Sequence, residues 1–422
     1  MSRKPGDWLL RTGALEAFTT LDVYRPVSRR GSLSPLVFFS TWPVSELPVQ
    51  AAMFQVATAA ALARPRDLRS RRGIAGLALT AASVAGLIGL RRAAGRVDGE
   101  LELALVDALG PDYRHQIRRP EWPAEPAGHT KPPGAVRSML IRKRFAQDTD
   151  VAYGPHGRHN LLDVWRHPDL PASAKAPVLL QVPGGGWVTG DKQVQAYPLM
   201  SHLAERGWIC VAMSYRLAPK ASWPDFLIDV KRAIAWIRAN IAEHGGDPDF
   251  LCITGGSAGG HLSSLAALTP NDPAYQPGFE DVDTSVKAAV PLYGVYDWVD
   301  EGGVGHSGLP RMLERLVVKG KLKDNPEPYH AASPLYQIGA DAPPMFVLHG
   351  TNDSLVPVEQ ARVFVERLRE LSKDTVAYAE LPLAQHAFDL FGSVRATATA
   401  EAIGRFLGVV YGRSVYGREQ QA

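Results

Sequence analysis

Short apolar segments alternate with longer helical patterns from Asn160 towards the end of the chain. The apolar segments have the length of β-strands, and several are apolar at consecutive positions, as parallel strands are when helices cover both faces of a sheet. They are residues 161–165, 178–182, 209–215, 251–254, 288–293, 345–348 and 376–381. Between the third and fourth, apolar residues recur at helical spacing from Phe226 to Ile241, and Gly245-Gly246 ends the helix. This alternation predicts an α/β protein with a mostly parallel sheet and helices on both faces.

The first third of the chain follows another pattern. Residues 47–63 and 73–90 carry no charge, and the link between them, residues 64–72, holds five arginines. The second segment is just long enough, as a helix, to cross a hydrocarbon core of about 30 Å. We therefore expect a helical hairpin in or on a membrane. The alternative is a pair of Ala- and Gly-rich helices packed against a soluble body, because Ala and Gly insert weakly into bilayers.

The arginine-rich link also predicts an orientation. Short loops rich in arginine resist translocation, so we expect residues 64–72 on the cytoplasmic side. Two crossings then place the rest of the chain on the outer side. If only residues 73–90 span, the flanking arginines nearly balance and either side is open. A hairpin that dips into one leaflet would leave the body in the cytoplasm.

Composition divides the chain into four parts. We assign residues 1–96 to the basic, apolar, membrane-associated region. Residues 97–145 form a helical segment and a Pro-rich linker, the latter at residues 120–133. Residues 146–412 form the α/β domain, with an insertion at about residues 295–337, and residues 413–422 form a C-terminal tail.

The overall composition limits the function of the 422 residues. Lys and Arg number 46 against 43 Asp and Glu, a net charge of +3, which is too balanced to indicate a nucleic-acid binder. The excess of positive charge lies in the first third, as expected of a part that meets a membrane surface. The two cysteines, Cys210 and Cys252, cannot supply a disulfide framework or a four-ligand zinc site. We expect no metal and no cofactor.

One glycine-rich turn has the pattern of a catalytic serine. Gly255-Gly-Ser257-Ala-Gly259 follows an apolar strand and opens a helix near His261, which is the setting of a nucleophile elbow. The glycines let strand and helix approach while the serine adopts strained backbone angles. The alternative is a glycine-rich helix start that binds an anion or only turns the chain.

A serine nucleophile requires a base, and in folds with such an elbow the order along the chain is nucleophile, acid, histidine. Beyond Asp353 the sequence holds one histidine, His386, in the loop after the last predicted strand. Asp353 directly follows the strand at residues 345–348 and could accept the imidazole Nδ1–H. Asp297 is the alternative acid, although a helix-capping role suits it better.

Three consecutive glycines, Gly184–Gly186, follow the strand at residues 178–182. Residues without a Cβ let two N–H groups point into a shared cavity. There they would stabilise an oxyanion together with the N–H of Ala258, the residue after the serine.

Five motifs in this order resemble the hormone-sensitive-lipase-like branch of the α/β-hydrolase carboxylesterases. They are Gly184-Gly-Gly-Trp187, Ser214-Tyr-Arg-Leu-Ala-Pro219, Gly255-Gly-Ser-Ala-Gly-Gly260 and the segments around Asp353 and His386. The resemblance covers roughly residues 150–410. The chain is also similar to actinobacterial-type lipase/esterases with an apolar N-terminal extension and, more distantly, to isoprenylcysteine methylesterases.

The resemblance implies an α/β-hydrolase fold and a full set of site residues. These are the triad Ser257, Asp353 and His386, and the oxyanion-hole residues Gly185, Gly186 and Ala258. It also implies that the insertion at residues 295–337 contributes to a cap over the acyl pocket; an ordinary crossover helix is the alternative. One departure concerns Pro183, which stands where the family's His-Gly-Gly-Gly motif has histidine. The support that this histidine gives the loop must come from the fixed φ of proline or from other residues.

The sequence therefore predicts a membrane-associated serine carboxylesterase or lipase that hydrolyses esters of apolar acyl groups through an acyl-enzyme. Its expected partners are a small-molecule or lipid ester and a membrane, and not a nucleic acid. A methylesterase of prenylated substrates is the alternative within the same chemistry. A non-catalytic scaffold with this fold is the alternative outside it.

Overall fold

Eight strands form one sheet in the computed structural model, which describes residues 4–120, 122 and 135–421. They are β1 (Ala146–Ala152), β2 (Leu161–Trp165), β3 (Ala176–Val182), β4 (Ile209–Met213), β5 (Gly246–Gly256), β6 (Ala288–Leu292), β7 (Met345–Gly350) and β8 (Val376–Leu381). Their order across the sheet is β1-β2-β4-β3-β5-β6-β7-β8. β2 is antiparallel to β1 and β4, and the other neighbours are parallel. The predicted α/β architecture and its seven predicted strands are confirmed. β1 is an edge strand of polar sequence, which gives no apolar signal.

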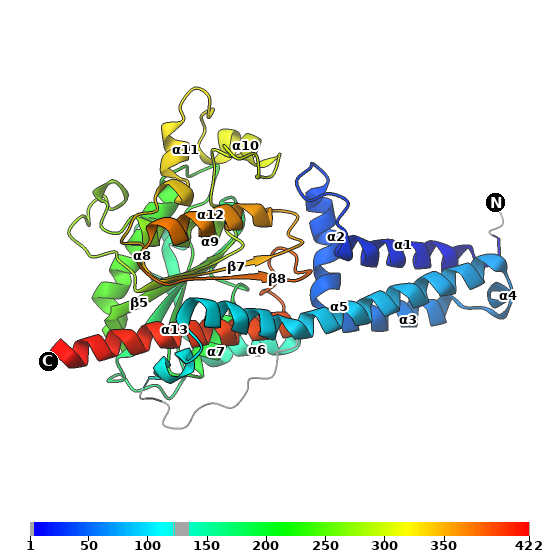
Figure 1. The fold of residues 1–422 in the computed structure, drawn as a ribbon, viewed down its shortest axis with the longest axis horizontal. Helices are drawn as coiled ribbons and strands as arrows, with labels where there is room; N and C mark the ends of the chain where they lie inside the picture. The colour runs from blue at the N-terminus through cyan, green and yellow to red at the C-terminus, as the bar shows by residue number, and fades with distance from the viewer. Residues whose placement is uncertain (1–3, 121, 123–134, 422) are drawn as a thin grey trace.

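Helices cover both faces of the sheet (Figure 1). One face carries α8 (Asp225–Asn240), α9 (Ala258–Leu268) and α12 (Val358–Leu371). The other carries α7 (Tyr197–Ala204), α13 (Val394–Gln421) and the second half of α5 (Arg71–Leu109), while α6 (Ala135–Phe145) leads into β1. Strand residues alternate between these layers: on β3, Val178 and Leu180 face the first, and Leu179 faces the second.

Three N-terminal helices form an arm that projects from this body (Figure 1). The arm consists of α1 (Asp7–Tyr24), α3 (Pro48–Leu62) and residues 71–90 of α5. The short helix α4 (Pro65–Leu68) lies at its tip, where the N–H of Gly6 donates to Asp67 Oδ1 (2.8 Å). α3 and α5 make the hairpin expected from the sequence, and α1 is a third member that the sequence pattern did not indicate.

Small residues hold α1 close to α5. A Cβ on Gly13 would lie 2.3 Å from the carbonyl oxygen of Gly76, so the two backbones touch directly. Farther along, Thr20 Oγ1 and Ser83 Oγ share a hydrogen bond of 2.8 Å. The contacts join positions 63 residues apart in both cases, which means that α1 and α5 run parallel, from the tip towards the body. Contacts of this kind are common between membrane helices.

α2 (Ser34–Glu46) lies at the base of the arm and is built into the body. Glu46 forms an ion pair with Arg395 of α13, and both side chains are fully buried. Trp42 Nε1 donates to the carbonyl oxygen of Ala387 (2.9 Å). Breaking a buried ion pair by removing one partner typically costs about 3–5 kcal/mol. α2 is therefore part of the folded body and cannot be removed with the arm without cost.

Two of the three predicted domain limits fall inside helices, whereas the limit between residues 145 and 146 coincides with the junction of α6 and β1. α5 is 39 residues long and passes through residue 96, so the arm and the body share one helix. α13 passes through residue 412 and continues to Gln421. Most of the Pro-rich stretch at residues 120–133 lies outside the described residues.

Candidate active site

Four loops bring the predicted site residues together at one edge of the sheet. β3 leads into Gly184–Gly186, β5 into Ser257, β7 towards Asp353 and β8 towards His386. Because the strands are parallel, their carboxyl ends lie on the same edge, which is where such sheets carry their ligand sites. Ser257 and His386 line the same cavity.

Ser257 stands on a strained turn between β5 and α9. Its φ of 59° and ψ of −122° lie outside the regions that side chains favour. The turn is held by the N–H of Ser257, which donates to the carbonyl oxygen of Leu292 (3.0 Å). A Cβ on Gly255 would lie 2.5 Å from Gly259 O, and one on Gly259 would lie 2.1 Å from Val182 O. Only glycine fits at either position, as the elbow pattern predicts.

His386 and Asp353 form a direct pair. Nδ1 of His386 lies 2.6 Å from Oδ2 of Asp353. The other carboxylate oxygen, Oδ1, accepts hydrogen bonds from the N–H groups of Leu355 and Val356, each 2.8 Å long. His349 Nε2 lies 3.2 Å from Oδ2, so a second histidine contacts the same carboxylate. These contacts thus fix the orientation of the Asp353 carboxylate independently of His386.

These contacts keep Asp353 ionised. Burial raises the pKa of its carboxyl group, but the charge of His386 and the hydrogen bonds from His349 and His386 outweigh burial. The pKa of Asp353 therefore lies below its ordinary value. A carboxylate that stays charged can hold the Nδ1 proton and stabilise an imidazolium.

Asp297, the alternative acid, is occupied elsewhere. Its Oδ1 accepts a hydrogen bond from the N–H of Val299 (2.8 Å), which closes a local turn. Burial raises the pKa of the Asp297 carboxyl group. Among the described residues it makes no hydrogen bond or ion pair with a histidine. The geometry favours a turn-forming role for Asp297, in line with the capping role expected for it.

The glycine loop presents free donors. The φ values of Gly185 and Gly186 are +130° and +59°, which side chains rarely adopt. Within the part of the chain that the structure describes, the N–H groups of Gly185, Gly186 and Ala258 have no hydrogen-bond acceptor. Such unpaired N–H groups beside a serine are what an oxyanion would need.

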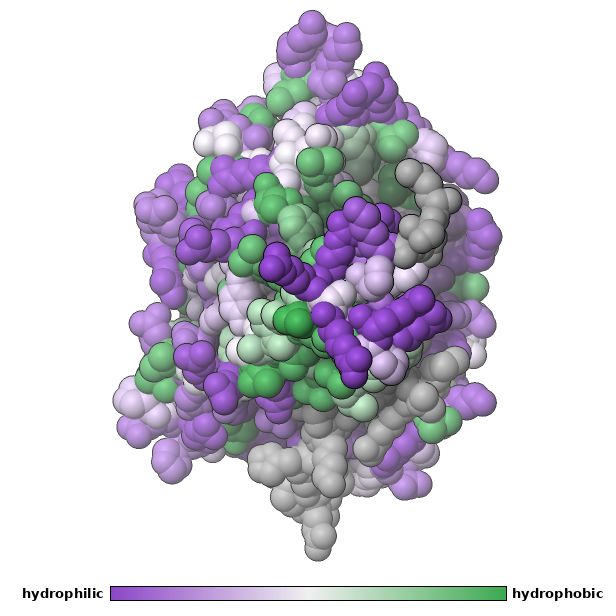
Figure 2. Space-filling model, turned by 90° about the vertical axis from the view of Figure 1, so that its right-hand side faces the viewer, coloured by the Kyte–Doolittle hydropathy of each residue, from purple (hydrophilic) through white to green (hydrophobic). Residues whose placement is uncertain are grey.

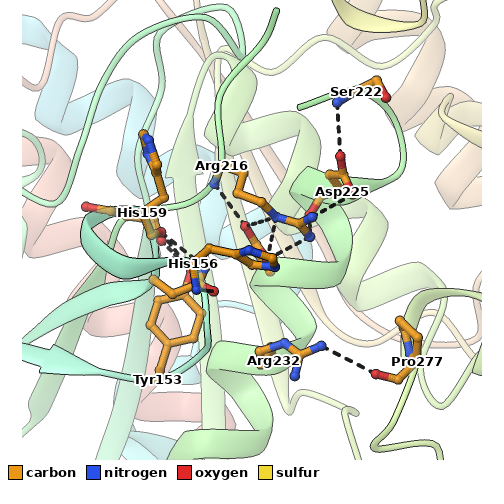
Figure 3. A network of polar contacts seen from close by, with 11 residues as sticks. Tyr153, His156, His159, Arg216, Ser222, Asp225, Arg232 and Pro277 are labelled. Carbon is orange, nitrogen blue, oxygen red and sulfur yellow. Dashed lines mark hydrogen bonds and ion pairs between the residues drawn. The ribbon is translucent and has the colours of Figure 1, made fainter. Parts of the chain in front are cut away.

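Residues of the Ser214–Pro219 motif donate hydrogen bonds to the backbone of this loop. Tyr215 Oη donates to the carbonyl oxygen of Pro183 (3.0 Å), and Ala218 N–H donates to Trp187 O (2.8 Å). The motif itself is fixed by Arg216, whose guanidinium contacts the carboxylates of Asp225 and Asp229 (Figure 3). The two carboxylates belong to α8, so the loop is tied to a helix of the body.

The cavity beside Ser257 has a volume of about 1090 Å³. Much of its wall is apolar, formed by Phe38, Phe39, Leu309, Met312, Val356 and Leu390. Leu309 and Met312 belong to the predicted cap insertion, on α10 (Leu309–Met312), which precedes α11 (Glu327–Ala331). The two phenylalanines come from α2. The sequence pattern gave no sign that this N-terminal helix reaches the cavity.

Two other side chains that sequence reasoning missed surround His386. The Tyr293 ring lies 4.5 Å from the imidazole, centroid to centroid, and its hydroxyl donates to Asp389. Phe38 of α2 meets the imidazole edge-on at 6.0 Å. Tyr293 ends an apolar strand, which could have marked it, whereas Phe38 is more than 300 residues from His386 and has no such signal.

Metal binding has no obvious place near these groups. Among residues 4–120, 122 and 135–421, no cluster of three or more His, Cys, Asp or Glu side chains is arranged to hold an ion. Cys210 and Cys252 are buried and unpaired to each other.

The fold and the site define the class as an α/β-hydrolase esterase, and comparison with known proteins agrees. The BD-FAE family model matches residues 162–368. "Probable carboxylic ester hydrolase LipM" of Mycobacterium tuberculosis is 52% identical, over 97% of this chain and 95% of LipM. The chain belongs to this family of carboxylic ester hydrolases. The α/β-hydrolase fold is thereby confirmed, and the non-catalytic scaffold is set aside.

Two further relatives are more distant. Esterase 2 of Thermogutta terrifontis, solved with bound butyrate, is 26% identical with a TM-score of 0.52, over 61% of this chain and 91% of that chain. "Probable isoprenylcysteine alpha-carbonyl methylesterase ICMEL1" of Oryza sativa subsp. japonica is 30% identical over 52% of each chain. The similarity to LipM includes the N-terminal third, whereas the similarity to the methylesterase covers about half of either protein.

Proposed function

We propose that the chain hydrolyses carboxylic esters through an acyl-enzyme on Ser257. His386 takes the hydroxyl proton as Oγ attacks the ester carbonyl carbon. The resulting oxyanion accepts hydrogen bonds from the N–H groups of the loop and of the elbow, at Gly185, Gly186 and Ala258. His386 then gives its proton to the alcohol oxygen, the C–O bond breaks, and the alcohol leaves. Water, activated by His386, releases the acid in the same way.

One observation carries this proposal: the 2.6 Å contact between His386 and Asp353, in the loops next to the strained Ser257 turn. Each group has a separate task. Asp353 accepts a hydrogen bond from the Nδ1–H of His386 and so fixes the imidazole, which leaves Nε2 free to act as the base. The apolar cavity wall supports an ester with an apolar acyl group, since burying that group removes it from water. Butyrate bound to the Thermogutta esterase is consistent with a short or medium chain.

Ester hydrolysis should rise with pH along a single titration curve. Only neutral imidazole can act as the base, so activity should be lost towards acid pH. Asp353 adds no second step, because its lowered pKa keeps it ionised over the same range. The measurement is kcat/KM for p-nitrophenyl butyrate between pH 4 and pH 9. Two separate acid limbs, in protein that stays folded, would contradict the assignment of a permanently ionised acid.

The arm supports a second proposal, that residues 7–24, 48–62 and 71–90 lie in a membrane. Their packing differs from that of a soluble helix bundle, which turns its large apolar residues inward, although Leu9, Val23 and Leu87 are buried here. Large apolar side chains are exposed on all three helices: Leu15, Phe18, Met53, Phe54, Ile74 and Ile88. Polar side chains such as Thr20, Gln55, Thr80 and Ser83 are buried between them. α5 is the one helix of the described chain that is long and apolar enough to cross a membrane.

The charges at the tip support a definite orientation. Figure 2 looks onto the tip and shows hydrophilic side chains beside the apolar ones of the arm. Five arginines lie at residues 64–72, and the N-terminus is attached to the same end through Gly6 and Asp67. Because α1 and α5 run from the tip to the base and α3 runs back, the body lies at the opposite end. With the tip on the cytoplasmic side, the body faces outward.

Full-length protein should stay in the membrane fraction after a carbonate wash and need detergent for extraction. Replacing Met53 and Phe54 by lysine should weaken this retention. Each charge near the bilayer centre costs about 2.5–3.5 kcal/mol on insertion scales. Val363→Lys, at a half-exposed apolar residue on α12 of the body, is the matched control and should change nothing. Full-length protein that is soluble without detergent would overturn the proposal. Deletion of residues 1–96 is a poor test, because it also removes Glu46.

Orientation can be read from cysteine labelling, since Cys210 and Cys252 are buried. Leu68→Cys reports on the tip and Glu243→Cys on the body, and both positions are exposed. In intact cells, a membrane-impermeant maleimide should label Cys at position 243 and reach position 68 only after permeabilisation. The reverse pattern would place the body in the cytoplasm.

A further inference from the structure

The side chain of Gln195 makes two hydrogen bonds to one residue of the glycine loop, Gly184. Its Oε1 accepts a hydrogen bond from the Gly184 N–H (2.7 Å), and its Nε2 donates to the Gly184 carbonyl oxygen (3.2 Å). The side-chain amide therefore pairs with both backbone groups of Gly184. These groups belong to the two peptide planes on either side of the Cα atom, so Gln195 fixes both planes at once.

We propose that Gln195 is a positioning residue that aims the oxyanion hole by holding the peptide plane of the Gly185 N–H; this inference rests on the proposed function. The Gly184 carbonyl and the Gly185 N–H belong to one planar, trans peptide and point in opposite directions. When Gln195 Nε2 holds the carbonyl oxygen, the N–H is directed away from Gln195. It is one of the loop N–H groups left without an acceptor.

The loop needs such a hold because glycines do not fix their own conformation. Gly185 and Gly186 both adopt positive φ, and the peptide before Gly185 has no side chain to restrict its rotation. If that peptide turned over, a carbonyl oxygen would replace the N–H and repel a developing oxyanion. Pro183, at the start of the loop, carries no N–H, and its carbonyl is held by Tyr215. Tyr215 and Gln195 thus support the loop at Pro183 and Gly184.

Strained backbone on both sides of Gln195 indicates that the position of its side chain is required. Val194 has a φ of 72° and Ala196 a φ of 55°, both in the left-handed region. For a β-branched residue this is a genuine outlier, and such strain collects at functional sites. The same stretch leaves the Val194 side chain 61% exposed while Gln195 turns inward. The conformational preferences of these residues alone would favour neither the left-handed φ values nor the exposed valine.

Two variants test the two hydrogen bonds between Gln195 and Gly184. Gln195→Leu removes both hydrogen bonds. Gln195→Glu keeps an acceptor for the Gly184 N–H but places an oxygen against the Gly184 carbonyl oxygen. We expect both to lower kcat for p-nitrophenyl butyrate about 10²-fold, the typical effect of losing one oxyanion donor, with KM changed less than about threefold. Gln147→Glu introduces the same charge at an exposed residue of β1 outside the cavity wall and should stay within about twofold of the parent.

A second readout distinguishes positioning from general stability. A trifluoromethyl ketone adds to the catalytic serine as a hemiketal whose oxyanion occupies the same hole. Its inhibition constant should rise in parallel with the loss of kcat, while the unfolding temperature and the pH midpoint of activity stay unchanged. Parent-like kcat in Gln195→Leu, or full activity in Gln195→Glu, would overturn the inference. So would an effect on KM alone. Activity retained in Ser257→Ala would instead overturn the proposed function, so the two failures are distinguishable.

Discussion

Ser257→Ala is expected to abolish ester hydrolysis without unfolding the protein. Removal of a catalytic serine alone typically lowers kcat by about 10⁶-fold in this type of mechanism. The fold should tolerate the change, because the turn is held by the N–H of Ser257 and not by its hydroxyl. Alanine also has a Cβ, so it meets the same backbone strain at φ 59° as serine does. We therefore expect an unchanged unfolding temperature together with complete loss of turnover.

The measurement is a panel of p-nitrophenyl esters from acetate to palmitate, in detergent and in membranes, alongside thermal unfolding. A fluorophosphonate probe, followed by peptide mass spectrometry, should label Ser257 and no other serine. A residual rate within about tenfold of the parent, in folded protein, would move the nucleophile elsewhere. The panel also reports the preferred acyl length, which the apolar cavity leaves open.

The sequence predicted those parts of the protein whose signal is local. β3, β4, β6 and β7 are buried along their whole length, so each is a largely apolar run that stands out from its neighbours. Ser257 could be proposed from the sequence because glycines are required within two residues of it. Asp353 and His386 could be proposed because the order of elements restricts the candidates to the loops after β7 and β8.

The missed features depend on contacts between distant parts of the chain. Trp42 and Ala387 are 345 residues apart, and Asn352 Nδ2 reaches the Val23 carbonyl across 329 residues. No spacing rule connects such positions. α2 therefore looked like an interrupted apolar segment, whereas it forms part of the cavity wall and packs on His386. Gln195 was missed for the same reason, since its role is defined by the loop that it contacts and not by its neighbours.

This arrangement changes how the N-terminal third should be understood. A detachable anchor would end at the predicted limit near residue 96, and its loss would leave the esterase intact. The structure instead places α2 and the end of α1 against the Asp353 and His386 loops, through Trp42 and Val23. If the arm lies in a membrane, as proposed, the cavity is held close to the bilayer surface. An ester with an apolar acyl group would then meet the cavity where such esters are concentrated.

Asp353→Asn is expected to lower kcat by about 10⁴-fold while KM changes little. The amide can present an NH₂ group to His386 Nδ1, which favours the tautomer whose Nε2 carries the proton and cannot act as a base. The loop itself should hold, because an amide oxygen can still accept the hydrogen bonds from Leu355 and Val356. The effect should therefore lie in the chemical step and not in folding.

Asp297→Asn is the matched control for this prediction, since it makes the same isosteric change at the alternative acid. Its amide oxygen can still accept the Val299 N–H, and Asp297 has no contact with His386 among its hydrogen bonds. We expect activity within about threefold of the parent. Measuring kcat and KM for both variants, with unfolding temperatures as a check, decides between the two acids. A crippled Asp297→Asn beside an active Asp353→Asn would show that the 2.6 Å pair is structural and that the acid has been assigned to the wrong loop.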